Sequence, residues 1–228
     1  MYTKMLAAIL NLIFPKKCVN CSKAGEFLCT ACIEKITWHE EAKCLMCGGR
    51  AIGGYTHPRC LGNWSLDRSI LLAYHRGPIR KLIHSLKYRK LSSEAGFVAR
   101  LMAERLEKGE LEGFVVAAVP LYFAREMARG FNQAEALGRE LAKNLSLPYR
   151  GDWWYRTRGT ETQTELDKKD RSKNVQHAFR IYSRDGLKGA KVLLVDDVIT
   201  TGATVRECAK VLKRSGAREV WVLALAHG

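Results

Sequence analysis

Two adjacent acids followed by a run of hydroxyl side chains give the first indication of chemistry in this sequence. Asp196 and Asp197 come directly after an apolar run, so we expect them where a buried strand leaves its sheet. Carboxylates there can accept hydrogen bonds from ribose hydroxyls and can support a Mg²⁺ ion. A predicted helix follows, and a phosphate monoester can bind to backbone N–H groups and hydroxyls at its start. The residues of this turn are Thr200, Thr201, Gly202, Ala203 and Thr204.

Other phosphate-binding folds need motifs that this sequence lacks. An apolar run before two acids also occurs in P-loop NTPases, but those need a G-x-x-x-x-G-K-[ST] loop, and no Gly-Lys pair is present. The G-x-G-x-x-G motif of dinucleotide-binding folds is absent as well. A buried strand with a capped helix explains the apolar residues but not two acids and three threonines. We therefore interpret residues 195–204 as a site for ribose and its 5′-phosphate.

Seven of the eight cysteines fall between Cys18 and Cys60, in pairs that share one spacing. Each pair has two intervening residues, and a histidine replaces one cysteine in the last pair. Such a pair presents two ligands from a tight turn, and two pairs complete the tetrahedron that Zn²⁺ prefers. The simplest assignment is two Zn²⁺ sites, one formed by Cys18, Cys21, Cys29 and Cys32 and the other by Cys44, Cys47, His57 and Cys60.

The spacing does not show which two of these four residue pairs bind the same ion, because a cross-braced arrangement would use the same residues. Unrelated buried or redox-active thiols would not be expected to repeat one spacing four times. A complete tetrahedron has no open position for a substrate, so we expect the zinc to be structural and to supply much of the folding energy. Cys208 stands alone in a later predicted helix and is assigned to core packing.

The longer part of the chain alternates predicted strands and helices. Residues 114–120, 191–195 and 220–226 are near-continuous apolar runs, as expected for strands covered on both faces. Asn132 is suited to cap one predicted helix, and Thr204 begins another. The predicted fold class is therefore α/β, with a doubly wound parallel sheet that binds ligands at the carboxyl ends of its strands.

Composition and charge limit the class of protein. The chain is 47% hydrophobic with a formal net charge of +15, which suits a globular protein that meets phosphates in nucleotides, nucleic acid or a membrane surface. Residues 1–14 have no cleavage site and are too short for a membrane span, so we expect a cytoplasmic protein without an integral membrane segment. Helical spacing there predicts a short amphipathic helix that buries Leu6, Ile9, Leu10 and Ile13.

The residues now described carry a resemblance to a known family. Residues 195–204 resemble the signature of type I phosphoribosyltransferases, and the wider pattern is similar to the ComF family of competence proteins. The resemblance implies a type I phosphoribosyltransferase-like sheet in residues 63–228, behind a short helix and double zinc ribbon in residues 1–62. Besides the ribbons, the stretches that carry it are Arg129-Gly130-Phe131-Asn132-Gln133-Ala134, Thr162-Gln163-Thr164, Asn174-Val175 and Ala178-Phe179.

The resemblance also implies a ligand, phosphoribosyl pyrophosphate (PRPP), bound together with Mg²⁺. It gives Asp196 and Asp197 the role of catalytic residues, and residues 200–204 that of the phosphate turn. The polar stretch 156–176 corresponds to a loop that closes over PRPP, which would exclude water. The turn after Pro120 corresponds to the pyrophosphate loop, although its arginines also suit a solvated helix face. Its donors are Arg125, Arg129, Asn132 and Gln133.

Two functions remain open. By resemblance, ComF proteins act in natural transformation, where they handle incoming single-stranded DNA in the cytoplasm beside the DNA-uptake machinery. The alternative is an active phosphoribosyltransferase of nucleotide metabolism or salvage, which transfers ribose 5-phosphate to an acceptor and releases pyrophosphate. No segment identifies an acceptor pocket or a general base.

The charge distribution favours contact with DNA in part. Basic side chains exceed acidic ones in residues 63–184, including the runs Lys87-Tyr88-Arg89-Lys90 and Lys168-Lys169. Basic grooves with interleaved aromatics can follow single strands by charge and stacking. The aromatic candidates are Trp153, Trp154 and Tyr155, which would otherwise pack in the core or brace the zinc module.

Overall fold

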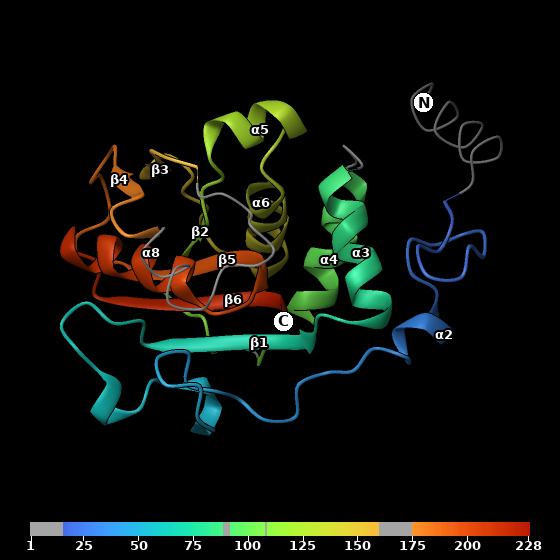
Figure 1. The fold of residues 1–228 in the computed structure, drawn as a ribbon, viewed down its shortest axis with the longest axis horizontal. Helices are drawn as coiled ribbons and strands as arrows, with labels where there is room; N and C mark the ends of the chain where they lie inside the picture. Colours follow the sequence, from blue (N-terminus) through green and yellow to red (C-terminus); the bar gives the residue numbers. More distant parts are fainter. Residues whose placement is uncertain (1–15, 89–91, 108, 160–174) are drawn as a thin grey trace.

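Figure 1 shows the fold of the chain as a computed structural model, which describes residues 16–88, 92–107, 109–159 and 175–228. Several predictions fall outside these residues. They are the N-terminal helix with Leu6, Ile9, Leu10 and Ile13, the basic residues Arg89, Lys90, Lys168 and Lys169, and most of the loop at 156–176 with Thr162, Gln163, Thr164 and Asn174.

A four-stranded parallel sheet forms the centre of the longer domain. Its strand order is β1 (Arg68–Tyr74), β6 (Glu219–His227), β5 (Lys191–Ile199) and β2 (Phe114–Ala118). The apolar runs of β5 and β6 occupy the two central positions, where both faces of a strand are covered. The carboxyl ends of β5 and β2 therefore lie side by side at one edge of the sheet.

Element boundaries differ from the sequence prediction beside the candidate site. Strand β5 continues through Asp196 and Asp197 to Ile199, because β6 reaches His227 and continues to pair with it. Helix α8 begins at Ala203 rather than Thr204, and Gly202 occupies its N-cap position. Asp196 and Asp197 thus lie on the last part of β5, and not in the loop after the strand as predicted.

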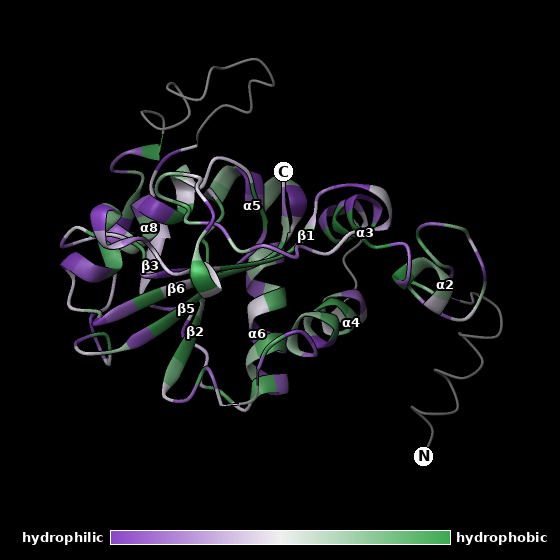
Figure 2. Cartoon of the chain, turned by 90° about the horizontal axis from the view of Figure 1, so that it is seen from below, coloured by the Kyte–Doolittle hydropathy of each residue, from purple (hydrophilic) through white to green (hydrophobic). Residues whose placement is uncertain are grey.

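Helices cover both faces of the sheet, as Figures 1 and 2 show. Val192 and Leu194 of β5 pack with α8, whereas Leu193 and Val195 pack with the helices of the opposite face. Cys208 is fully buried on α8, which confirms its assignment to core packing. The remaining bounds are α3 (Gly77–Tyr88), α4 (Ser92–Ala103), α5 (Phe123–Arg129), α6 (Gln133–Leu145), α8 (Ala203–Arg214) and the antiparallel pair β3 (Trp154–Arg156) and β4 (Phe179–Ile181).

The cysteine-rich segment wraps around the edge of this sheet. Its regular elements are α2 (Thr30–Ile33), which lies beyond α3 in Figure 1, and two single turns at Ile52–Gly54 and Pro58–Cys60, which lie below β1. A Cβ at Gly54 would come within 2.0 Å of the Ser69 carbonyl oxygen, so only glycine permits this close approach to β1. Among the described residues, no helix has the length and apolar character to cross a membrane.

Candidate ligand site and metal centres

The two acids of β5 have different neighbours. Asp197 is buried, with 4% of its surface exposed, and its Oδ2 lies 3.0 Å from the Lys87 Nζ of α3. Asp196 acts electrostatically on Arg156 and Cys208 on the opposite side of the sheet. This arrangement follows from the alternation of side chains along a strand. The acids remain linked, because the Asp197 backbone N–H donates to Asp196 Oδ1 at 2.9 Å.

Asp196 is held in an environment that disfavours its charged form. Burial raises the pKa of the Asp196 carboxyl well above its usual value, and the charge of Asp197 raises it further, while Lys87 opposes the effect weakly. Strongly shifted carboxyls of this kind are common at binding and catalytic sites. A divalent cation or a hydroxyl donor placed beside these oxygens would relieve the cost of the charge.

The predicted phosphate turn lies directly beyond β5. Gly202 adopts the left-handed conformation with φ of 73° at the N-cap of α8, without a side-chain cap. The first-turn N–H groups of a helix lack intrahelical partners and therefore favour an anion. The turn is anchored by Arg206, whose Nη1 donates to the Thr201 carbonyl at 2.7 Å and to the Leu45 carbonyl at 2.8 Å.

The donors assigned to the pyrophosphate loop lie on α5 and at the start of α6. Asn132 caps α6 by accepting from the Ala134 N–H, and its Nδ2 donates to the Val119 carbonyl at 3.1 Å. The Asn132 amide therefore binds the backbone at the end of β2 and the start of α6, and it is not directed at a ligand. Arg129 donates a hydrogen bond to Gln133 Oε1. Arg125 acts electrostatically on Arg156, the same residue that Asp196 affects.

The first metal-ligating group consists of Cys18, Cys21, Cys29 and Cys32. Their sulfur atoms all lie within 4.8 Å of one another, and the sulfurs of Cys21 and Cys29 are 3.7 Å apart. Tetrahedral Zn²⁺ with bonds of about 2.3 Å requires sulfur separations of about 3.8 Å, so this group fits the ion. The Asn20 amide donates to Cys32 Sγ at 3.2 Å, as an outer-shell partner would.

The second group consists of Cys44, Cys47, His57 and Cys60, again with ligand atoms within 4.8 Å. The Nδ1 of His57 faces Cys47 Sγ at 3.3 Å, while Nε2 lies 2.8 Å from the Arg50 carbonyl oxygen. That carbonyl can only accept, so Nε2 carries the proton and Nδ1 is left with the lone pair that a metal needs. The ligands thus gather in two local sets rather than in a cross-braced arrangement, and both donor sets suit structural zinc.

Three side chains of this region were not predicted as site residues. Lys87 was assigned to a basic run for DNA, but it forms the ion pair with Asp197. Arg156 approaches the site from a segment distant in sequence, and Arg206 on α8 joins the turn to the distant Leu45, so the fold reveals both roles. The apolar spacing of Ile79, Leu82, Ile83 and Leu86, which is helical, was the signal that would have placed Lys87 on α3.

The aromatic residues proposed for base stacking are largely inaccessible. Trp153 is fully buried and donates through Nε1 to the Asp185 carbonyl at 2.7 Å. Trp154 is also buried and packs against Phe179. Tyr155 is 49% exposed, because the alternation of the strand turns it outward. The two tryptophans therefore belong to the core and only Tyr155 of the three is available to a ligand.

Comparisons with known proteins agree with this architecture. Residues 95–227 match the phosphoribosyl transferase domain family, and residues 9–61 match the double zinc ribbon domain family. Competence protein F of Haemophilus influenzae is 31% identical over 227 residues, which cover 94% of this chain and 98% of that protein. DNA utilization protein YhgH of Escherichia coli K12 is 34% identical over 210 residues, which cover 88% and 90%.

Among solved structures, the glutamine PRPP amidotransferase from B. subtilis aligns with 61% of this chain and 30% of its own, at 20% identity and a TM-score of 0.42. The domain match and the parallel sheet define a protein with the type I phosphoribosyltransferase fold, preceded by a double zinc ribbon. The chain belongs to the ComF family of competence proteins.

Proposed function

We propose that this protein binds PRPP with Mg²⁺ at the carboxyl end of β5 and uses that site in natural transformation. Its task would be the handling of incoming single-stranded DNA in the cytoplasm, in contact with the DNA-uptake machinery. One observation carries the proposal: Asp196, Asp197 and the Gly202 turn at the start of α8 stand in succession at one edge of the sheet. Ligands of open α/β sheets bind at this edge.

Each part of PRPP has a matching set of groups in this proposal. Asp196 and Asp197 accept hydrogen bonds from the ribose hydroxyls. The turn of Thr200, Thr201, Gly202, Ala203 and Thr204 binds the 5′-phosphate through N–H groups and hydroxyls, aided by the helix dipole. The diphosphate lies toward α5, where Arg125, Arg129 and Gln133 supply donors.

The carboxylates also suit Mg²⁺, which prefers oxygen ligands and binds through one or two carboxylates together with substrate phosphates. Asp196 and Asp197 are the residues that would hold it. When bound, Mg²⁺ would neutralise charge on the diphosphate of PRPP. Lys87 Nζ already lies 3.0 Å from Asp197 Oδ2 and offsets its charge, so Mg²⁺ at this carboxylate would compete with Lys87.

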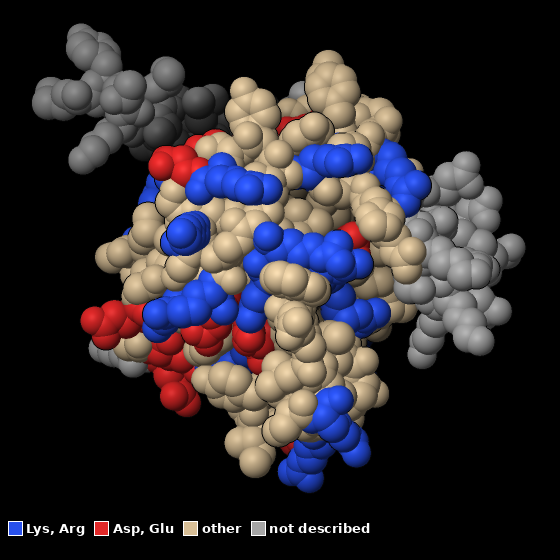
Figure 3. Space-filling model, turned by 90° about the vertical axis from the view of Figure 1, so that its left-hand side faces the viewer, with Lys and Arg blue, Asp and Glu red and all other residues tan. Residues whose placement is uncertain are grey.

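The role in DNA handling is supported by relatives and by charge. The relatives carry the names competence protein and DNA utilization protein, and they align over most of both chains. The chain has a formal net charge of +15, and Figure 3 shows basic side chains spread across one face. Such a surface attracts nucleic acid through its phosphates, with an affinity that falls steeply as salt increases.

The proposed binding of PRPP is tested by calorimetric titration of the zinc-loaded protein with PRPP and Mg²⁺. The double variant Asp196→Asn/Asp197→Asn is titrated beside it, since asparagine keeps the shape of each side chain but removes its charge. We expect binding heat for the wild type and none for the variant at the same concentrations. Zinc content and thermal unfolding of both proteins show whether the variant remains folded.

If titration of the wild-type protein with PRPP and Mg²⁺ gave no binding heat, the PRPP proposal would be overturned. The DNA-handling role would then rest on DNA binding alone, which is measured separately by the salt dependence of its affinity for single strands. Equal binding by wild type and double variant would place the PRPP site elsewhere on the chain.

A further inference from the structure

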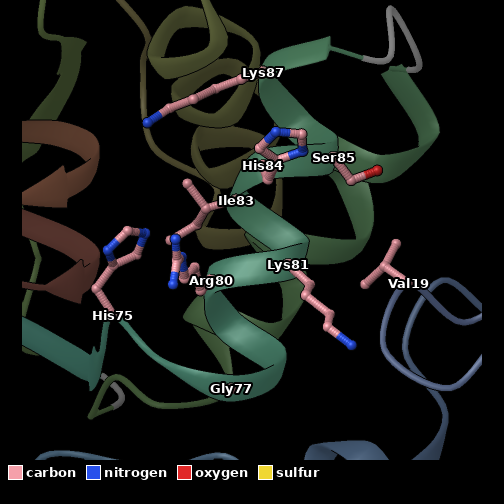
Figure 4. A pocket seen from close by; sticks show the side chains of 9 residues that line it. All are labelled: Val19, His75, Gly77, Arg80, Lys81, Ile83, His84, Ser85 and Lys87. Atoms are coloured by element: carbon pink, nitrogen blue, oxygen red, sulfur yellow. The ribbon is translucent and has the colours of Figure 1, made fainter.

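A cleft of about 860 Å³ opens beside α3, next to the segment Cys18–Cys32 that holds the first cysteine group and is here called the first ribbon. Figure 4 shows it from close by, with α3 in the middle, His75 on one side and Val19 of the ribbon on the other. The ribbon is held there by Lys81, whose Nζ donates to the Asn20 carbonyl at 3.0 Å. The cleft is thus a built feature that depends on both parts of the chain.

All ionisable side chains that line the cleft are basic. Three further cavities of the described residues each include at least one glutamate, and this cleft differs from them in charge. Arg80 has no carboxylate within ion-pair distance in the described part of the chain, so its charge is available to a ligand. The ionisable lining residues are His75, Arg80, Lys81, His84 and Lys87.

The inner end of the cleft reaches the proposed PRPP site. Lys87 lines the cleft and also forms the ion pair with Asp197. His75 lies beside Thr200, since both are within 3.7 Å of a Cβ built on Gly228. In Figure 4 its ring points toward Arg80 of α3. A ligand in the cleft would therefore lie directly beside PRPP.

Electrostatics at the inner end favour an anion. The pKa of His75 is lowered, first by burial and then by the positive charges of Lys87 and Arg80, with only Asp197 acting in the opposite direction. The imidazole is therefore neutral at physiological pH and offers one donor and one acceptor. A phosphate between Arg80 and Lys87 would offset the mutual repulsion of these two cations.

We propose that this cleft binds the phosphate groups of a nucleotide, either free or within single-stranded DNA, as the second ligand beside PRPP. The inference rests on the proposed function and deepens it, because it assigns the DNA-handling role to one surface. The cleft contacts come from α3 and the first ribbon, whereas the PRPP contacts come from β5, α5 and α8. Apart from Lys87, which borders both, each set can therefore be changed separately.

The test uses the zinc-loaded full chain and a fluorescent single-stranded oligodeoxynucleotide, whose binding is measured by anisotropy over a range of salt. The cleft variant is Arg80→Gln/Lys81→Gln. Its matched control is Arg184→Gln/Lys188→Gln, which removes the same two charge types from exposed positions before β5, at the opposite edge of the sheet. Arg80→Gln alone is a second variant, because it keeps the bond between Lys81 and Asn20.

We expect the double cleft variant to bind the oligonucleotide at least about tenfold more weakly, with a salt slope reduced by roughly 0.7 for each DNA phosphate that the variant no longer neutralises. Arg80→Gln should show an intermediate reduction in affinity, and the control should bind like the wild type. A deoxynucleoside monophosphate should displace the oligonucleotide, whereas the nucleoside without phosphate should not.

Equally weakened binding in the cleft variant and its control would overturn the proposal, as would unchanged binding in Arg80→Gln and the double variant. Displacement by the nucleoside as effective as by the nucleotide would also overturn it, since phosphate would then be dispensable. Calorimetry with PRPP keeps the two proposals apart, because the cleft variants should bind PRPP normally while Asp196→Asn/Asp197→Asn should not.

Discussion

The two cysteine-rich sites of this protein have similar ligands but differ in how they join the rest of the chain. In the first site, Cys21 is exposed and the other three ligands are buried. Its ribbon meets the phosphoribosyltransferase fold at α3, through the hydrogen bond from Lys81 to Asn20. The second site is more exposed, with Cys44 as its one buried ligand. Even so, it connects to both β1 and the phosphate turn.

The connection of the second site is made by backbone carbonyls of its own knuckle. The Lys43 carbonyl accepts from Ser69 Oγ of β1 at 2.7 Å, and the Leu45 carbonyl accepts from Arg206, which also binds the Thr201 carbonyl. The more exposed metal site is therefore the one that contacts the phosphate turn. Zinc at the second site fixes the conformation of a knuckle on which the turn of Thr201 depends, whereas zinc at the first fixes one wall of the basic cleft.

The strongest test of this difference removes one exposed ligand from each site. Cys47→Ser and Cys21→Ser should each lose one zinc ion, since both positions are exposed and complete a tetrahedron. We expect Cys47→Ser to weaken PRPP binding by tenfold or more, about 1.4 kcal/mol, because the Leu45 carbonyl is no longer held beside Arg206. Zinc content and calorimetry with PRPP provide the two measurements.

Cys21→Ser is the matched control, and its PRPP affinity should stay close to that of the wild type. If Cys21→Ser weakened PRPP binding as much as Cys47→Ser, the two zinc sites would act alike on the phosphate turn.

A smaller effect is expected from Arg206→Gln, which leaves the zinc ligands in place. The variant removes both hydrogen bonds of a half-buried guanidinium but leaves the zinc-bound Leu45 segment in its own conformation, so we expect a loss of PRPP affinity below the tenfold of Cys47→Ser. PRPP binding should weaken while the zinc content stays unchanged. Lys210→Gln, one turn further along α8, serves as the control because its ion pair with Glu207 spans 3.8 Å and contributes little. Loss of zinc from Arg206→Gln would show that Arg206 supports the metal rather than the turn.

Much of this arrangement was predictable from local sequence patterns. The doubly wound sheet followed from apolar runs such as residues 191–195, and the two cysteine sets followed from repeated spacing, as the fold and the domain matches confirm. The cap at Asn132 was also predicted from the residue type and its place before an apolar face.

Contacts between distant segments were not predictable in this way. Arg206 and Leu45 are 161 residues apart, and no local pattern records that they meet. Lys87 was assigned to a basic run for DNA because charge alone does not indicate which way a helix faces. The end of β5 was placed too early, because paired acids favour a loop by composition while the partner strand β6 extends the sheet to Ile199.

Asp196→Asn should behave differently from the zinc-ligand variants. Its thermal stability should rise while its affinity for PRPP falls. The raised pKa of Asp196 means that the folded state binds this proton more tightly than the unfolded chain does. The free energy of unfolding therefore falls as the pH rises from the ordinary pKa of aspartate toward the pKa of Asp196 in the folded protein. Asparagine removes this cost, so the ligand-free variant should unfold at a higher temperature at neutral pH and lose that advantage in acid, as calorimetric scans would show.

Asp152→Asn should show the reverse sign, because Arg150 holds the pKa of Asp152 below its usual value. A lower unfolding temperature for Asp196→Asn at neutral pH would contradict the assignment of an electrostatic cost to this carboxyl. The zinc-ligand variants differ from both, since they should lower stability and change binding only at the second site.

The smallest effect is expected where the first ribbon meets α3. Lys81→Met keeps the aliphatic stem but removes the bond from Nζ to the Asn20 carbonyl, which lies at the surface and should contribute less than about 1 kcal/mol. Zinc content and PRPP affinity should be unchanged, and thermal unfolding should shift only slightly. A loss of PRPP binding comparable to that of Arg206→Gln would mean that the first ribbon also positions the phosphate turn. Because the described contacts connect that turn to Leu45 and not to Asn20, we expect the two ribbons to remain distinct in this test.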